Sequence, residues 1–127
     1  MRPELQRRVQ RYGWDYSSPH YEEGWQKQLW PAQQRLIEAA DPQPGEAVLD
    51  ISCGTGLVTF PIAKAVAPGG TVTGIDLSEG MIEQTAELAK EQGVDHVSFR
   101  HMDAEELTLG DGVFDLAVNS LGLMYYP

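Results

Sequence analysis

The chain has 127 residues, of which 42% are hydrophobic, and 19 acidic residues against 9 basic ones leave a net charge of -10. This balance is typical of one globular domain rather than a disordered chain, and its acidity argues against nucleic acid as a partner, because phosphates attract clustered Lys and Arg. No apolar run is long enough to span a membrane, no secretory signal is evident, and a lone Cys53 excludes an internal disulfide, so we expect a cytoplasmic protein.

Residues 1–40 differ in composition from the rest of the chain, because they hold all of its tryptophans and few β-branched residues. Apolar side chains at Trp25, Leu29, Ala32 and Leu36 follow the three- and four-residue spacing of a helix. Pro31 is expected to open a separate helix at its first turn. We therefore predict a helical segment over residues 1–40, with Trp25 and Trp30 serving as packing residues.

The pattern changes after a turn at residues 41–46, where short apolar runs begin to alternate with helical segments. The predicted strands are residues 47–51, 71–76, 96–103 and 112–120, and the predicted helices are residues 57–67 and 79–93. Pro61 is tolerated if it lies in the first helical turn, Ser78 is a good N-cap, and Gly93 is the expected C-cap. This order predicts an α/β fold with a Rossmann-like, doubly wound and mostly parallel sheet, in which ligands bind at the carboxyl ends of the strands.

The turn after the first strand, in the segment VLDISCGTGLVTF (residues 48–60), carries two glycines that indicate a ligand site. Gly54 and Gly56 permit backbone angles that are closed to other residues and allow a ligand to approach the main chain. Asp76 ends the second strand 20 residues after Gly56, where a carboxylate can accept hydrogen bonds from a ribose diol. Together these features predict a site for a ligand that contains a nucleoside.

Charge separates the candidate ligands. A dinucleotide carries a pyrophosphate, which a carboxylate beside the loop would repel, and Asp50 stands four residues before Gly54. Thr59 also replaces the third glycine or alanine of the dinucleotide pattern. S-adenosylmethionine has no phosphate and carries two positive groups, so acids at three successive strand ends, Asp50, Asp76 and Asp103, favour it. A nicotinamide-dependent oxidoreductase remains the less favoured alternative.

Four ordered segments, VLDISCGTG, TGIDLSEGMIEQ, HMDAEEL and FDLAVNSLGLMYYP, resemble the class I S-adenosylmethionine-dependent methyltransferases. The resemblance is to the small-molecule group that includes the ubiquinone and menaquinone C-methyltransferases, and it covers residues 47–127. It implies an enzyme that transfers a methyl group to a small organic acceptor at carbon, oxygen or nitrogen. Residues 1–40 look like the N-terminal helical cap of that family, followed by a cofactor-binding core over residues 41–127.

The resemblance also implies roles for individual residues of the cofactor site. By position, the cofactor-binding residues would be Asp50 at the ammonium, Ser52, Cys53 and Gly54 under the methionine part, Gly56 in the same turn, Asp76 at the ribose, Leu77 and Met81 on the adenine ring, Asp103 and Ala104 at the adenine edge, Asn119 and Ser120 at the methionine end, and Tyr21 near the sulfonium. Ser52 departs from the family pattern, which has glycine there; this is a mild change because Gly54 and Gly56 remain.

No catalytic residue is assigned from the sequence. His101 and His20 are the candidate bases, although His101 fits a partly exposed strand residue better than a base. Cys53 is better explained as a small residue whose backbone faces the ligand than as a nucleophile. His96, His101 and Asp103 lack the spacing of a metal site, so we expect no metal.

The family's sheet has seven strands and four are predicted here, so we expect a core truncated after its fourth strand. The favoured explanation is a fragment of a larger enzyme, which alone would bind weakly and catalyse nothing. A non-catalytic S-adenosylmethionine-binding module is the alternative. An unpaired fourth strand would also offer an apolar edge through which a homodimer could form.

Overall fold

A computed structural model of the chain describes residues 2–127, with residues 22–24 described by their backbone alone. The helices are α1 (Pro3–Ser17), η1 (Ser18–His20), α2 (Tyr21–Ala40), α3 (Thr59–Val66), α4 (Glu79–Glu91) and η2 (Leu123–Tyr125), and the strands are β1 (Ala47–Ile51), β2 (Thr71–Asp76), β3 (Val97–His101) and β4 (Leu116–Asn119). The four predicted strands and the two helices between them are therefore present. None of the described helices is both long and apolar enough to cross a membrane.

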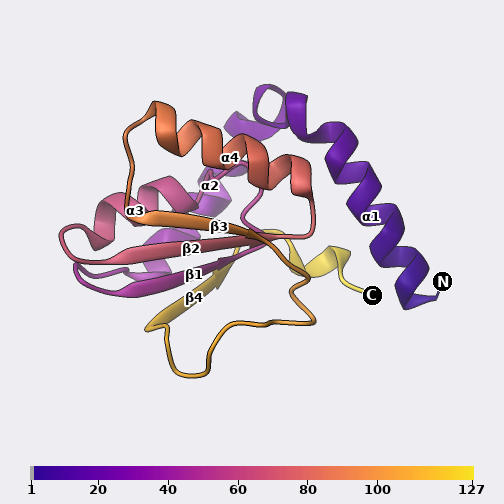
Figure 1. The fold of residues 1–127 in the computed structure, drawn as a ribbon. Coiled ribbons are helices and arrows are strands. Elements are labelled where there is room, and N and C mark those ends of the chain that lie inside the picture. The colour runs from indigo at the N-terminus through magenta and orange to yellow at the C-terminus, as the bar shows by residue number, and fades with distance from the viewer. Residues whose placement is uncertain (1) are drawn as a thin grey trace.

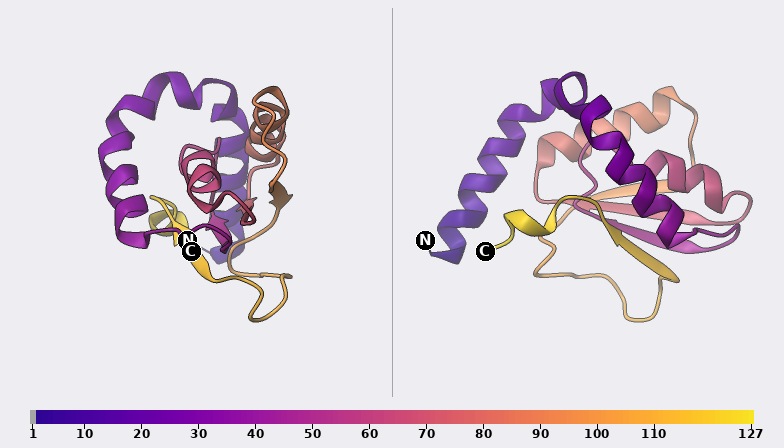
Figure 2. Two further views of the ribbon diagram at one scale, coloured as in Figure 1. Left: turned by 90° about the vertical axis from the view of Figure 1, so that its left-hand side faces the viewer. Right: turned by 180° about the vertical axis from the view of Figure 1, so that it is seen from behind.

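The four strands form one parallel sheet in the order β3-β2-β1-β4 (Figure 1). The order reverses between β1 and β4, which is the topological switch point of a doubly wound α/β fold. Helices α2, α3 and α4 cover one face of the sheet, and the segment from residue 102 to residue 115 runs across the other (Figures 1 and 2). The predicted Rossmann-like α/β class is confirmed.

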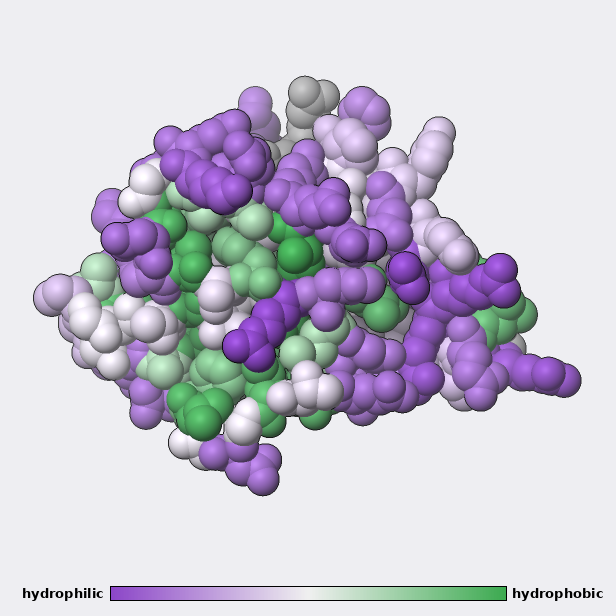
Figure 3. Space-filling model, in the orientation of Figure 1, coloured by the Kyte–Doolittle hydropathy of each residue, from purple (hydrophilic) through white to green (hydrophobic). Residues whose placement is uncertain are grey.

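The core lies between the sheet and the helices on its covered face. Alternation along each strand turns Val48, Val72 and Val118 to that face, where they meet Ile62 and Val66 of α3. Polar side chains cover the outward surfaces of α1 and α4, whereas apolar side chains gather over the middle of the molecule (Figure 3). Among the described residues, the buried apolar side chains between the sheet and the helices form one core cluster.

Local signals set the ends of the helices. The Ser78 hydroxyl accepts a hydrogen bond from the Met81 amide at the start of α4, and Gly93 adopts a left-handed φ of 67° just beyond its end. Pro61 lies in the first turn of α3, where its missing N–H costs no helical hydrogen bond. The predictions for Ser78 and Pro61 are confirmed, whereas the C-cap residue is Gln92 and Gly93 lies one position beyond it.

The prediction that Pro31 opens a separate helix is wrong, because α2 runs unbroken from Tyr21 to Ala40 and contains Pro31. Pro31 and Lys27, whose carbonyl the proline ring opposes, both lie on the exposed side of α2, so the lost hydrogen bond faces solvent and the helix can stay convex toward solvent without losing core contacts. The prediction that Trp25 and Trp30 are packing residues is also wrong, since Trp25 is 53% exposed and Trp30 is 40% exposed. The side chains of α2 that pack against the core are Leu36, Ile37 and Ala40.

Candidate functional site

A cavity of about 490 Å³ lies where the carboxyl ends of the strands face the N-terminal helices. Three groups of residues line it: Ser52, Gly54, Asp76, Leu77 and Met81 at the strand ends and the start of α4; Gln10, Trp14, Ser17, Tyr21, Trp25 and Leu29 from α1 and α2; and Ser120, Leu121, Gly122, Met124, Tyr125 and Tyr126 after β4. Helix α1 lies beside the carboxyl ends of the strands in Figure 1 and in the right-hand view of Figure 2. The cavity is therefore at the place where parallel sheets bind their ligands.

The two glycines of the β1 turn have different tasks. Gly54 and Gly56 both adopt positive φ angles, 55° and 89°. A Cβ on Gly54 would meet no atom within 4 Å, and Gly54 lines the cavity. A Cβ on Gly56 would lie 2.5 Å from Phe60 and 2.7 Å from Thr85. Gly54 thus leaves the backbone open to a ligand, whereas Gly56 lets the turn pack against α3 and α4.

Asp76 joins the glycine turn to the start of α4. Its Oδ2 accepts from the Gly54 N–H and its Oδ1 accepts from the Ser78 N–H, each at 2.9 Å. Burial raises the pKa of the Asp76 carboxyl, while the two backbone bonds act in the opposite direction. Each carboxylate oxygen can accept two hydrogen bonds and here accepts one, so Asp76 keeps capacity for further donors in the cavity.

Asp50 lies behind the turn instead of at its mouth. Its side chain is 1% exposed, and its Oδ2 accepts a 2.6 Å hydrogen bond from the Thr59 hydroxyl. Burial raises the pKa of the Asp50 carboxyl to about 7, although the Thr59 bond lowers it. Thr59, which stands at the third-glycine position, is therefore the buried partner of this acid.

At the other side of the turn, Ser52 departs from the ordinary backbone of a serine, with a φ of 59°. Its hydroxyl lies 2.6 Å from the Tyr126 hydroxyl, which also accepts a 2.9 Å hydrogen bond from the Asn119 amide. These contacts join the ends of β1 and β4 to the segment that follows β4. Tyr126 lies in the last of the four segments that resemble the family, but the sequence analysis assigned it no role in the site.

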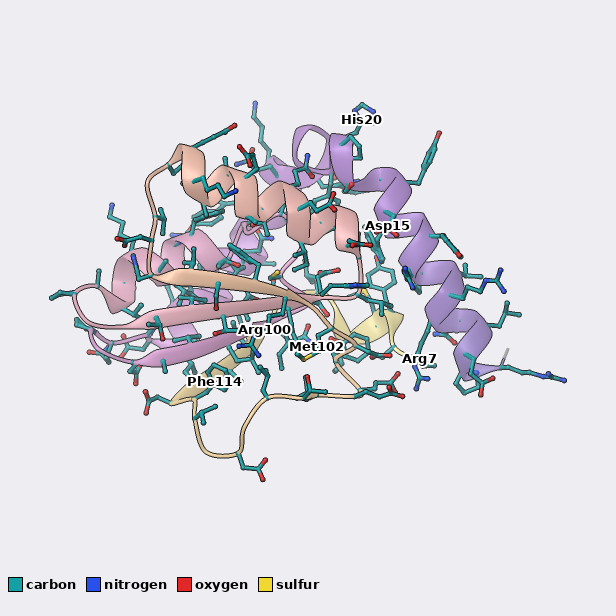
Figure 4. The ribbon with its side chains drawn as sticks, in the orientation of Figure 1. Arg7, Asp15, His20, Arg100, Met102 and Phe114 are labelled. Atoms are coloured by element: carbon teal, nitrogen blue, oxygen red, sulfur yellow. The ribbon has the colours of Figure 1, made fainter. Side chains whose placement is uncertain are left out.

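Asp103 is engaged by helix α1. Its Oδ2 lies 3.3 Å from the Arg7 Nε, which also donates to Glu105 at 3.0 Å. The hydrogen bond to Glu105 is the main reason that the pKa of Arg7 is raised. Figure 4 shows Arg7 on α1 beside the segment after β3. The Asp103 carboxylate is outside the cavity lining, held by this ion pair.

A second link between α1 and the core comes from Asp15. Its Oδ1 accepts from the Ser78 hydroxyl at 2.6 Å and from the Gly80 N–H at 3.2 Å. Asp15 lies on the side of α1 that faces the start of α4 (Figure 4). A Cβ on Gly80 would lie 2.8 Å from the Ser18 hydroxyl, so glycine is needed for this close approach. Sequence reasoning missed Asp15 because its partners lie 63 and 65 residues away.

Aromatic side chains form the wall opposite the strand ends. Trp14 packs edge-on against Tyr21 and Tyr125, with ring centroids 5.7 Å and 5.2 Å apart. Burial raises the pKa of the Tyr21 phenol, with smaller contributions from Tyr125 and Asp76. Trp14 lies in the aromatic-rich segment of residues 1–40 that was predicted to form a cap, but no sequence pattern marked it as a cavity residue in preference to the neighbouring aromatic residues.

The cavity brings together seven of the thirteen predicted cofactor residues. Those that line it are Ser52, Gly54, Asp76, Leu77, Met81, Ser120 and Tyr21; those outside its lining are Asp50, Cys53, Gly56, Asp103, Ala104 and Asn119. Cys53 is buried against β2, close to Gly74. Of the candidate bases, His101 bonds through its Nε2 to the Leu77 carbonyl, and His20 is exposed at the top of Figure 4; neither lines the cavity.

Comparison with known proteins gives a family match over residues 48–127, to a methyltransferase domain. The chain is 42% identical to nocamycin O-methyltransferase of Saccharothrix syringae over 76% of its length, 38% identical to aklanonic acid methyltransferase DauC of Streptomyces sp. (strain C5) over 89%, and 38% identical to a demethylmenaquinone methyltransferase of Staphylococcus aureus (strain JH9) over 80%. It spans 35%, 51% and 41% of these relatives.

Solved structures show the same fold. Phosphoethanolamine N-methyltransferase 1 of Haemonchus contortus matches the whole chain with a TM-score of 0.83 at 21% identity, and the chain covers 28% of it. The [4+2]-cyclase SpnF matches 73% of the chain with a TM-score of 0.64 at 30% identity, and the chain covers 34% of it. Because a cyclase shares the fold, the family rests on the sequence match and not on shape. The predicted resemblance is confirmed: the chain belongs to the methyltransferase domain family.

Proposed function

We propose that this chain is the cofactor-binding part of an S-adenosylmethionine-dependent methyltransferase that acts on a small organic acceptor. The observation that carries the proposal is the pairing of Asp76 with the Gly54 amide on the wall of a cavity at the strand ends. The family match supports methyl transfer. The relatives named for nocamycin, aklanonic acid and demethylmenaquinone support a small-molecule acceptor.

The charges of the cavity fit a phosphate-free nucleoside. Among the described side chains that line it, Asp76 is the one acid, and none is Lys, Arg or His. A pyrophosphate would need cationic or N–H partners, yet the Gly54 N–H already donates to Asp76. A sulfonium and an ammonium are attracted by the same carboxylate. These observations favour S-adenosylmethionine over a nicotinamide dinucleotide.

The proposed roles follow the position of each residue. Asp76 would accept from the ribose hydroxyls, Leu77 and Met81 would pack against the adenine ring, and Gly54 would admit the ligand to the backbone. The other predicted contacts remain proposals; they are Asp50, Ser52, Cys53, Gly56, Asp103, Ala104, Asn119, Ser120 and Tyr21. For Asp50 an indirect role is proposed, because its carboxylate is buried behind the turn. Residues 1–40 would act as a cap, and residues 41–127 as the cofactor-binding core.

The cofactor would supply an electrophilic methyl group for direct displacement by the acceptor. The task of the chain is then to align the two reactants and to exclude water. The aromatic side chains Trp14, Tyr21 and Tyr125 suit this task, since they close the cavity opposite the strand ends with apolar surface. No described residue in the lining is a histidine, so we assign no catalytic base.

Titration calorimetry tests the proposal. S-adenosylmethionine and S-adenosylhomocysteine are expected to bind, and NAD is expected not to bind under the same conditions. Tight binding of NAD without binding of either sulfur compound would contradict the proposal. Methyl-transfer assays on small organic acceptors then separate an enzyme from a binding module that performs no catalysis.

Two further proposals concern the setting of the protein. A cytoplasmic location is supported by the single Cys53, which is buried and unpaired in the described chain.

A homodimer through β4 is supported by the position of β4 at the edge of the described sheet. Light scattering tests the dimer, because a monomeric mass at micromolar concentration would exclude it.

A further inference from the structure

Helix α1 carries a row of large exposed side chains along one side. They recur at intervals of four, three and four residues, a spacing that places them on one face of a helix: Leu5, Val9, Tyr12 and Tyr16. Their exposed fractions run from 50% for Leu5 to 88% for Tyr16. We call these four residues the α1 stripe. It meets no partner surface within the part of the chain that the structure describes.

The opposite side of α1 is the side that the rest of the chain holds. Gln10, Trp14 and Ser17 line the cavity, and Asp15 accepts from the Ser78 hydroxyl. None of the residues of α1, all of which are described, is buried. The helix stands at the end of the molecule, beyond the carboxyl ends of the strands (Figure 1). The α1 stripe is therefore a convex ridge that points away from the cavity.

Arginines surround this ridge. Four of the nine basic residues of the chain fall within its first eleven positions, where Glu4 is the one acid. Arg7 is paired with carboxylates after β3, whereas the other three are exposed: Arg2, Arg8 and Arg11. The Arg8 guanidinium lies 5.8 Å from the centre of the Tyr12 ring, so its charge is at the edge of the stripe. The outward side of α1 is thus positive in a chain whose net charge is -10.

The side chains of the stripe suit a surface that is partly apolar and partly wet. Tyrosine and arginine rank as hydrophilic on the scale of Figure 3, which is why this side of α1 looks polar there. A phenol nevertheless presents an apolar ring with a polar tip, and such side chains are enriched where bilayer hydrocarbon meets the headgroups. Leu5 and Val9 add aliphatic surface along the same line.

We propose that α1 is a docking helix for the surface of an anionic lipid bilayer. The helix would lie in the plane of the surface, with the α1 stripe at the boundary of headgroups and acyl chains and with Arg2, Arg8 and Arg11 on lipid phosphates. A plane can contact the whole length of a convex ridge, and the phosphates complement the local positive charge. Because the opposite side of α1 lines the cavity, docking would bring the cavity next to the bilayer. The docking does not depend on which cofactor the cavity binds.

Vesicle flotation tests the proposal. Vesicles made of equal parts phosphatidylglycerol and phosphatidylcholine are expected to carry the chain upward at low salt, whereas vesicles of phosphatidylcholine alone are not. Raising the salt from about 50 mM to about 500 mM should release most of the bound protein, because salt screens charges that lie near a surface. Titration with vesicles then gives a partition coefficient for each variant.

Two variants with matched controls separate the α1 stripe from general effects of charge. Leu5→Glu is expected to lower the partition coefficient about tenfold or more, since it removes apolar surface and adds a charge that lipid phosphates repel. Leu107→Glu makes the same change outside α1, at a leucine that is 47% exposed, and should bind as the unmodified protein does. Arg8→Gln should lower the partition coefficient about fivefold, and Arg35→Gln, at an exposed position of α2, should not.

The possible outcomes are distinct. Equal binding to neutral and anionic vesicles, or no binding to anionic vesicles at low salt, would overturn the proposal. Equal losses in the variants and their controls would overturn it too, because net charge alone would then explain the binding. If vesicles do not bind and light scattering finds a dimer that Leu5→Glu dissociates, the stripe belongs to a second copy of the chain. Calorimetry with S-adenosylhomocysteine on the same samples tests the proposed function separately.

Discussion

The Asp15 carboxylate accepts a 2.6 Å hydrogen bond from the Ser78 hydroxyl, which in turn accepts from the Met81 amide. A residue of α1 thereby extends the N-cap of α4 and ties the helical wall of the cavity to the sheet. Because Asp15 also accepts from the Gly80 N–H, its negative charge lies at the positive end of the α4 dipole. One side chain thus links the stability of α4 to the position of α1.

Asp15→Ala is expected to lower the free energy of unfolding by about 1–2 kcal/mol, because it removes two hydrogen bonds at a helix N-terminus. It should also weaken S-adenosylhomocysteine binding, since α1 supplies part of the cavity wall. Urea denaturation and calorimetry measure the two effects. The matched control is Asp111→Asn in the exposed segment before β4. Equal stability of the Asp15 and Asp111 variants would show that the link is not stabilising.

Asp76→Asn tests the ribose contact. Asparagine keeps the size of the side chain but has a single acceptor oxygen, so it cannot serve the Gly54 and Ser78 amides and a ribose diol together. We expect S-adenosylhomocysteine affinity to fall about tenfold to hundredfold, with a loss of about 1–2 kcal/mol in stability. Asp95→Asn, whose side chain is fully exposed, is the control and should bind as the unmodified protein does. Unchanged affinity in calorimetry would remove Asp76 from the site.

Gly54→Ala and Gly56→Ala should separate ligand binding from folding. Alanine at Gly56 would meet Phe60 and Thr85 at less than contact distance, so we expect a loss of about 2–4 kcal/mol in stability. Alanine at Gly54 has open space around it, so the backbone conformation alone should cost about 1 kcal/mol, while the new methyl group narrows the cavity. Thermal melting and calorimetry should therefore rank the two variants in opposite orders. The same ranking in both measurements would contradict the division of tasks between these glycines.

Asp50→Asn should change how stability depends on pH. The pKa of Asp50 is about 7 in the folded chain, above its ordinary value of 3.8, so folding favours the protonated form. Its contribution is fully present below about pH 4 and is lost as pH rises through about 7, at up to about 1.4 kcal/mol per pH unit. Asparagine can still accept from Thr59 and does not ionise. The variant should therefore gain stability relative to the unmodified protein between pH 5 and pH 8.

Urea denaturation of both proteins at pH 5 and pH 8 measures this difference, and groups common to the two proteins cancel in the comparison. Parallel pH profiles would show that the Asp50 carboxylate is ionised in the folded state throughout this range. That result would favour a direct electrostatic role for Asp50 toward the cofactor's ammonium.

Much of the fold could be predicted because its signals are local. The strands β1 and β2 have the predicted bounds, since an apolar run between turn residues can be recognised within a few positions. Ser78 acts as an N-cap through a bond to a residue three positions away. Pro31 was misjudged by the same local reasoning, because a proline on the exposed side of a helix does not end it when the rest of the helix is held by packing.

The candidate site could be predicted only in part, because much of it is made by residues far apart in the chain. Tyr126 reaches Ser52 across 74 positions, and Arg7 reaches Glu105 across 98. No spacing rule covers such pairs, so Tyr126 was missed and Asp103 was assigned to the cavity although Arg7 holds its carboxylate outside the lining. The sequence also did not reveal the direction of side chains. Asp50 lies close to the glycine turn, as predicted, but its side chain points into the core and bonds to Thr59.

The order of the amino acids was sufficient for the α/β fold, the glycine turn, the acid at the end of β2 and the family of the protein, because each depends on neighbours along the chain. The tertiary structure alone decided the contacts of α1 with the core, the separate roles of Gly54 and Gly56, and the hydrogen bonds of Tyr126 with Ser52 and Asn119. They depend on which surfaces pack together, and packing is settled by the shape and charge of the whole chain at once.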